Sequence, residues 1–335
     1  MTIPHLHFTM TAQEYLETKL KKLNHPAESD RLDDTDELVE AIFCAVLSKK
    51  FRKYSASEVL KMHIKNAVRL NVEKRQPINI TFVHGAYKLW RLEEAPEADW
   101  AELFALMYYS NWVKPICDIY ESGVWFDFFV DDLIVPHLGT ASVDDVRAYL
   151  TSYQELMDFL HSFQPPNLRM TITTVGSRFA SEEEFEQSLA GSIMLKQQEL
   201  SSGLPLLTDT DKARVELNTK STEAQLEDPS WREKVALIET AYSRTKAAPR
   251  YHKAPDKILA FTNSIPDVAI AVGSTRSSIA KFWVAVGALR RKGNDFSQVV
   301  LSPDQLQKAD FAFENVQIDR LHGKNFTKIR CIQED

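Results

Sequence analysis

Acidic side chains gather on one predicted strand in the first half of the chain. Asp127 lies inside the apolar run 124–130, and Asp131 and Asp132 follow that run directly. Because side chains alternate along a strand, Asp127 and Asp131 share one face and Asp132 lies on the other. Carboxylates are ligands that Mg²⁺ prefers, so one interpretation is a magnesium-dependent transferase using Asp127 and Asp131. The alternative is an exposed strand face, since a buried carboxylate must meet a cation or a hydrogen-bond donor.

A second group of polar residues follows the predicted strand 78–83. His84, Tyr87 and Lys88 come directly after this strand, where α/β sheets place the loops that bind ligands. Their position makes all three candidates for a substrate site. Ordinary packing at the surface is the alternative for each of them.

Asp99 and Glu102 stand at the predicted start of a long helix. Their three-residue spacing is that of a capping box, in which each carboxylate accepts a hydrogen bond from a backbone N–H group. Capping explains both residues without any catalysis. The same spacing also places both carboxylates at the mouth of a strand–loop–helix unit, so both remain candidates for the site.

An arginine surrounded by hydroxyl groups precedes the predicted strand 280–286. It is Arg276, in the run Ser274-Thr275-Arg276-Ser277-Ser278, and Lys281 lies inside the strand that follows. The rigid donor fork of arginine suits a phosphate or a carboxylate. The alternative for this run is a polar turn.

Apolar periodicity indicates the elements that position these residues. We expect helices over 11–23 and 34–51, a third helix capped by Ser55 or Ser57, and a helix capped by Ser142 or Asp144. The long helix that begins near Asp99 should kink or end at Lys114-Pro115. The predicted strands are 78–83, 124–130, 169–175, 258–261, 268–272, 280–286 (ending at Gly287), 299–301, 316–318 and 328–332.

This order of elements predicts an α/β protein with a central mixed sheet and helices on both faces. Residues 1–75 are expected to form an N-terminal helical segment packed on the core. Residues 76–180 and 251–335 are expected to form the α/β core, and residues 181–250 a helical insertion or lid.

Composition limits the classes of function. The chain has 335 residues and a formal net charge of -7, and this charge argues against a general nucleic-acid binder. It has only 10 glycines, the residue that phosphate-binding loops use. The sequence contains neither a GxGxxG nor a GxxxxGK[ST] motif, and no His and Cys cluster at zinc-binding spacing. Three well-separated cysteines suit free thiols in a reducing compartment. With no apolar run long enough to span a bilayer, we expect a cytoplasmic protein that binds no membrane.

The order of several features resembles the isocyanide synthase family, which includes pyoverdine/dityrosine biosynthesis proteins. The likeness covers roughly residues 40–160 and extends to the stretch 276–303. Where the family tends to show Ser-Asp-Gly after its second strand, this chain has Val130-Asp131-Asp132. The features that carry the resemblance are Phe51-Arg52, the Pro77-Ile78 strand, Lys88, the Pro96, Asp99 and Glu102 helix start, Tyr120 with Gly123, and Asp131-Asp132.

The resemblance implies a Rossmann-like fold and an enzyme that acts on an amino acid and a sugar phosphate without a bound metal or other cofactor. It implies that Lys88 meets the sugar carbonyl or phosphate, since a desolvated lysine can form an imine. Glu102 and Asp131 would then transfer protons, and Arg276 and Lys281 would hold phosphate.

His84, Tyr87, Asp99 and Asp127 complete the expected substrate site, as binding residues. Two other functions stay open beside the synthase: the magnesium-dependent transferase, and a non-catalytic binding or interaction protein. A pocket lined by apolar residues, with no convergent charged groups, would favour the binding protein.

Overall fold

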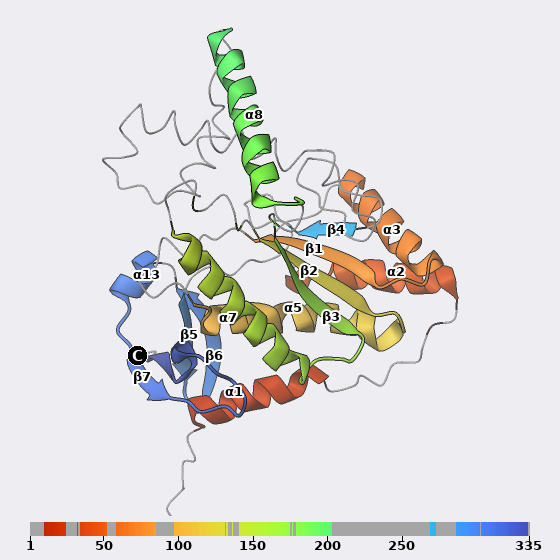
Figure 1. Ribbon diagram of the computed structural model, residues 1–335. Coiled ribbons are helices and arrows are strands. Elements are labelled where there is room, and N and C mark those ends of the chain that lie inside the picture. The colour runs from red at the N-terminus through yellow and green to blue at the C-terminus, as the bar shows by residue number, and fades with distance from the viewer. Residues whose placement is uncertain are drawn as a thin grey trace, which may run out of the picture.

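The computed structural model describes residues 10–24, 32, 34–51, 58–84, 97–130, 132, 136, 141–174, 176, 179–202, 269–272, 286–301 and 303–333 (Figure 1). In this part of the chain, two sheets and a set of helices share one apolar core.

The first sheet is parallel and carries the predicted site. Its strands are β1 (Ile78–His84), β2 (Val124–Val130), β3 (Leu168–Thr174) and β4 (Ala269–Val272), in the order β3-β2-β1-β4. The chain steps outward from β1 to β3 on one side, and β4 pairs with the other side of β1. The strand order therefore reverses between β1 and β4, which is where open α/β sheets bind their ligands.

One face of this sheet is apolar and buried under two helices. Phe126 and Phe128 of β2 are fully buried. Tyr109 of α5 (Trp100–Ile119) lies 5.0 Å from the Phe126 ring, and Tyr153 of α7 (Val143–His161) packs edge-on against Phe128 at 5.7 Å. Burial of large aromatic side chains contributes about 2–3 kcal/mol each, so this face holds α5 and α7 against the sheet.

The N-terminal helices extend the same core. They are α1 (Ala12–Lys21), α2 (Thr35–Val46) and α3 (Glu58–Glu73), with the short 3₁₀ helices η1 (Lys22–Asn24) and η2 (Lys49–Phe51). Ile64, Ala67 and Val68 form a buried apolar stripe on α3, whereas Val59 near the start of the helix is exposed.

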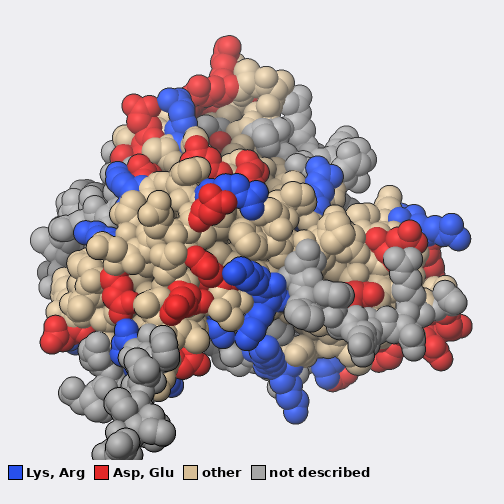
Figure 2. All heavy atoms as spheres, turned by 90° about the horizontal axis from the view of Figure 1, so that it is seen from below, with Lys and Arg blue, Asp and Glu red and all other residues tan. Residues whose placement is uncertain are grey.

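The basic residues that run beside the stripe of α3 are solvated and paired. Lys65 binds Glu40 and Arg69 binds Asp36 at 2.7 Å, both acids being on α2. These charges therefore belong to a solvated helix face. Figure 2 shows acidic and basic side chains interspersed in the same way over the underside of the molecule.

A second, mixed sheet covers the start of α5. It contains β5 (Val286–Lys292), β6 (Asp295–Leu301), β7 (Ala312–Asn315) and β8 (Lys328–Gln333) in the order β6-β5-β8-β7, and only β5 and β8 pair in parallel. The indole N–H of Trp100 donates to the carbonyl of Lys328 at 2.8 Å. Helix α13 (Pro303–Lys308) and the 3₁₀ helix η4 (Lys324–Phe326) complete this part.

The α/β class is confirmed, and the strands divide between the two sheets. Helix α8 (Glu182–Ser201) lies in the predicted insertion, begins close to the end of β3 and extends away from the sheet (Figure 1). The remainder of that predicted insertion, 203–250, lies outside the described residues, as does the predicted strand 258–261. No described helix has the length and apolar character needed to cross a membrane.

Three local predictions are wrong. Of the predicted kink or end at Lys114-Pro115, the end is wrong, because α5 continues through Pro115. Pro115 and Asn111 are both exposed, so water can reach the carbonyl that loses its donor. Gly287 does not end a strand but lies inside β5. The stretch 316–318 forms no strand, although Val316 and Ile318 are buried.

Candidate active site on the second face of the parallel sheet

The structure describes four of the nine predicted site residues at least in part. Asp99, Glu102 and Asp127 are described with their side chains, and His84 by its backbone, as the last residue of β1. The other five lie outside the described residues, and their roles stay predictions. They are Tyr87, Lys88, Asp131, Arg276 and Lys281.

The strand ends that precede these five residues are described. Phe82 of β1 pairs with Val272, the last residue of β4, and His84 pairs with Val130, the last residue of β2. Parallel pairing places the carboxyl ends of β2, β1 and β4 side by side. The three segments that carry the predicted residues therefore leave the sheet at neighbouring points.

Asp127 projects from the second face of the sheet and is almost completely buried, with 1% of its surface exposed. Its Oδ1 atom accepts hydrogen bonds from the hydroxyls of Thr171 at 2.6 Å and Thr173 at 2.8 Å. Its Oδ2 atom is buried and has no hydrogen-bond partner among the described residues. The alternative of an exposed strand face is therefore wrong for Asp127.

The register of β2 and β3 assembles this cluster. Asp127 pairs with Thr171, and Trp125 pairs with Arg169. Because side chains alternate along a strand, Arg169, Thr171 and Thr173 all project on the side of Asp127. By the same rule, Phe126 and Phe128 lie on the opposite, apolar face. Successive residues of β2 therefore contribute alternately to the apolar core and to the polar cluster.

Trp125 and Arg169 flank the buried carboxylate. The indole N–H of Trp125 donates to the Thr171 hydroxyl at 2.8 Å, and the Arg169 guanidinium lies over the Trp125 ring at 4.7 Å. Asn79 of β1, which is 9% exposed, pairs with Trp125 in the neighbouring position. Sequence reasoning missed Asn79, Thr171 and Thr173 as site residues. The alternation of polar residues at 169, 171 and 173 in a predicted strand was the available signal.

Asp99 and Glu102 form the predicted capping box at the start of α5. A carboxylate oxygen of Glu102 accepts from the Asp99 N–H at 2.8 Å, and Asp99 accepts from the Ala101 N–H at 2.6 Å. The second Glu102 oxygen lies 3.4 Å from the Tyr149 hydroxyl, which donates to it. Burial, followed by the Glu102 charge, raises the pKa of Tyr149 well above its ordinary value, so Tyr149 carries its proton at neutral pH.

This geometry separates the two predicted carboxylates. Helix α5, which carries Glu102, packs against the apolar face of the sheet through Tyr109, whereas Asp127 projects from the other face. Asp132 belongs to neither group: its Oδ1 atom accepts from the Gly176 N–H at 3.0 Å and ties the segments that follow β2 and β3. The described residues thus place Asp127 alone in a polar cluster with an unused oxygen.

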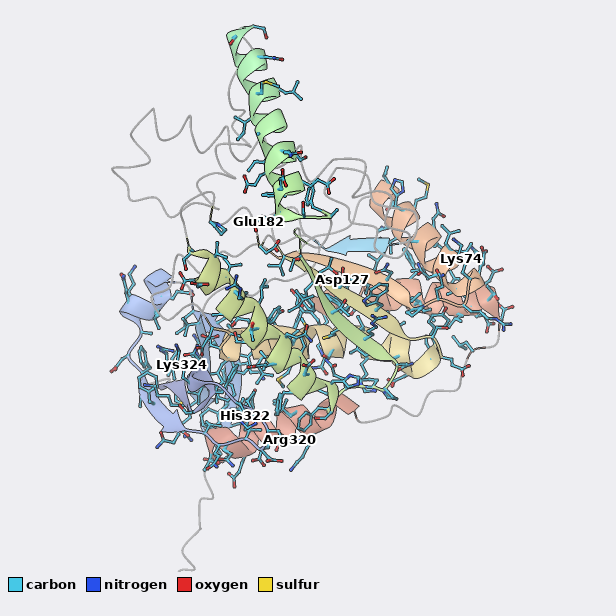
Figure 3. The ribbon with its side chains drawn as sticks, viewed as in Figure 1. Lys74, Asp127, Glu182, Arg320, His322 and Lys324 are labelled. Atoms are coloured by element: carbon cyan, nitrogen blue, oxygen red, sulfur yellow. The ribbon has the colours of Figure 1, made fainter. Side chains whose placement is uncertain are left out.

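A hollow lies between α7 and the loop that contains η4, away from Asp127. Its volume is about 520 Å³, and none of the predicted site residues lines it. The charges around it are paired and exposed, as in Arg147 with Asp144 at 3.0 Å and Lys324 with Glu97 at 3.2 Å. His322 and Lys324 line this hollow, and Figure 3 shows them apart from Asp127, which lies on the parallel sheet. No feature of the hollow points to a particular ligand.

The fold and the polar cluster define an α/β protein whose parallel sheet has the β3-β2-β1-β4 order of doubly wound folds. No protein-family model matches the chain, and no curated protein matches its sequence. Among solved structures, it is similar to the crystal structure of the PvcA protein from Pseudomonas aeruginosa. The TM-score is 0.57 and the identity 12%, over 89% of this chain and 99% of the PvcA chain. At this identity the likeness establishes a shared fold.

Proposed function

We propose that this protein is a small-molecule biosynthetic enzyme of the isocyanide synthase type, acting on an amino acid and a sugar phosphate. One observation carries the proposal: the buried carboxylate of Asp127, on the polar face of the parallel sheet, has one oxygen without a hydrogen-bond partner among the described residues. A buried, unpaired carboxylate is too costly to keep without a purpose, so it marks a site. The sequence resemblance and the PvcA-like fold indicate which chemistry that site performs.

The roles assigned from the resemblance complete the proposal. Lys88 is the nucleophile: its amine nitrogen adds to the sugar carbonyl and a water molecule leaves, which gives an imine. The resemblance assigns proton transfer to Asp131 and to Glu102, although the capping box places Glu102 on the apolar side of the sheet, away from Asp127. Arg276 and Lys281 hold the phosphate. His84, Tyr87, Asp99 and Asp127 bind the substrates. The adjacent ends of β1, β2 and β4 support this grouping, since most of these residues follow those three ends in the sequence.

The magnesium-dependent transferase receives less support. No group of three or more His, Cys, Asp or Glu side chains in the described part of the chain could hold a metal ion. Mg²⁺ demands octahedral oxygen coordination, and Asp127 offers it one free oxygen among the described residues.

A ligand screen followed by an activity assay tests the proposal. Thermal unfolding is measured with amino acids, pentose phosphates, nucleotides and Mg²⁺, since a ligand at about 100 times its Kd adds about 2.7 kcal/mol of stability. Tyrosine or tryptophan together with ribulose 5-phosphate is then incubated with the protein, and mass spectrometry detects the isonitrile.

The expected result is a stability shift with ribulose 5-phosphate that disappears in Lys88→Ala and persists in Lys74→Ala. Lys74 is an exposed residue just after α3 and serves as the matched control. A shift confined to Mg²⁺ with a nucleotide would instead establish the transferase. No shift with any member of the panel would contradict both enzymes and favour the non-catalytic binding protein.

A further inference from the structure

We infer that Oδ2 of Asp127 is the receptor for a protonated amine of the ligand, and that Thr171 and Trp125 are positioning residues that aim it. This inference deepens the proposed function and rests on it. It is carried by the direction of each hydrogen bond around the carboxylate, by the burial of Asp127, and by the place of the nearest described cation.

The direction of the hydrogen bonds follows from the proton count. An indole N–H can only donate, so the oxygen of the Thr171 hydroxyl is the acceptor in its 2.8 Å bond to Trp125. Thr171 has one proton, and that proton is directed to Oδ1 of Asp127 at 2.6 Å. Trp125 therefore fixes the rotation of the Thr171 hydroxyl, which would otherwise be free to turn away.

Oδ1 is fully occupied by this arrangement. Thr173 supplies a second hydroxyl donor to the same oxygen at 2.8 Å. Two donors on one side of the carboxylate hold its plane and leave Oδ2 as the only oxygen available to a ligand. With Asp127 1% exposed, bulk water does not solvate that oxygen.

The chemistry of Oδ2 selects its partner. A buried carboxylate oxygen that lacks a donor among the described residues is best satisfied by a group that brings both an N–H and a positive charge. A phosphate or a carboxylate would be repelled. Among the described cations on this face, Arg169 lies over the Trp125 ring at 4.7 Å and forms no ion pair with Asp127 in the part of the chain that is described. A protonated amine of the ligand satisfies both requirements.

The Asp127→Asn variant separates this inference from an ordinary internal ion pair. Asparagine keeps an oxygen that accepts from both threonines, and it replaces the charged, empty oxygen by an uncharged group. If Oδ2 awaits a ligand, the free protein should have an unchanged or higher Tm in this variant. If a cation of the protein already pairs with Asp127, the substitution breaks a buried pair and the Tm falls.

Binding measurements then test the amine directly. Calorimetry compares L-tyrosine and L-tryptophan with 3-(4-hydroxyphenyl)propanoate and indole-3-propanoate, which keep the ring and the carboxylate but lack the amino group. We expect the amino acids to bind more tightly than their deaminated analogues. Asp127→Asn should weaken only the amino acids, by about 10- to 100-fold, the range of a charged hydrogen bond.

Positioning residues should give a smaller and selective effect. Trp125→Phe keeps an aromatic ring beside Arg169 but removes the N–H, and Thr171→Val removes the hydroxyl with little change of shape. Both variants should reduce the preference for the amino acid over its deaminated analogue. A purely structural role would weaken both ligands of each pair equally.

Three results would overturn the inference: a fall in the Tm of free Asp127→Asn, equal binding of amino acids and their deaminated analogues, or no binding of either. These assays contain no sugar phosphate, so they do not depend on the synthase reaction. Selective binding of the amine without any isonitrile product would refute the proposed reaction and leave the amine receptor standing.

Discussion

Substitution of Glu102 tests whether its carboxylate caps a helix or transfers a proton. In Glu102→Ala, the buried N–H of Asp99 loses its acceptor at 2.8 Å, and the Tyr149 hydroxyl loses its acceptor at 3.4 Å. An unsatisfied buried donor costs about 1–3 kcal/mol, and the longer contact to Tyr149 belongs at the low end of that range. We expect Glu102→Ala to lower the free energy of unfolding by about 2–4 kcal/mol.

Glu102→Gln is the matched variant, because glutamine also completes a capping box. Its amide oxygen can accept from the Asp99 N–H, and its NH₂ group can donate to the Tyr149 oxygen. We expect the free energy of unfolding to change by less than about 1 kcal/mol in urea titrations. Equal losses in the two variants, or a neutral Glu102→Ala, would refute the capping geometry.

The isonitrile assay separates the two roles of Glu102. The proposed function assigns it proton transfer, and glutamine cannot take up a proton at neutral pH. A stable Glu102→Gln protein that forms no product would support a catalytic carboxylate. Full activity in that variant would confine Glu102 to the capping box and leave proton transfer to other residues of the proposed site.

Three further predictions concern the contact between β5 and the start of α5, the reactivity of the cysteines and their pKa. A Cβ at Gly287 would lie 2.4 Å from the Ala101 nitrogen, so Gly287→Ala should destabilise the protein by about 1–3 kcal/mol in urea. A Cβ at Gly191 would meet no neighbouring element within 4 Å, so Gly191→Ala should be neutral or stabilising. Similar losses of stability in the two variants would refute the contact. Ellman's reagent at pH 8 should modify exposed Cys44 but neither buried cysteine, Cys117 or Cys331; fast reaction of all three would contradict their burial. Burial raises the pKa of Cys117 and Cys331 from 9.0 to about 12, so the unfolded chain loses these two protons at a lower pH than the folded protein. The free energy of unfolding should therefore fall as the pH rises from about 9 towards 12. Urea midpoints that stay constant over this range would refute this pH dependence.

Elements with a local signal were predictable from the sequence. The predicted strand 124–130 has the bounds of β2, and Ser142 caps α7 as expected. The Asp99 and Glu102 capping box also formed as predicted. In each case the deciding contacts lie within a few residues along the chain, so periodicity and spacing contain the information.

Features that depend on distant pairing were not predictable. The partners of Asp127 on β3 lie 44 and 46 positions further along the chain, and a strand pattern specifies alternation but not register. A strand over 280–286 was predicted to end at Gly287, and glycine is in general unfavourable in strand interiors. Its place in β5 follows instead from the close approach of the start of α5, which a Cβ would block.

The two carboxylates show why donor counting decides between a structural and a functional interpretation. Asp127 and Glu102 are both buried acids, and both were candidate site residues from the sequence. Each oxygen of Glu102 already has a donor, from its own capping box or from α7, so the residue has a structural role. Asp127 has two donors on one oxygen and none among the described residues on the other. A fold gains nothing from leaving a buried acceptor empty, so Asp127 is the acid for which we infer a partner in the ligand.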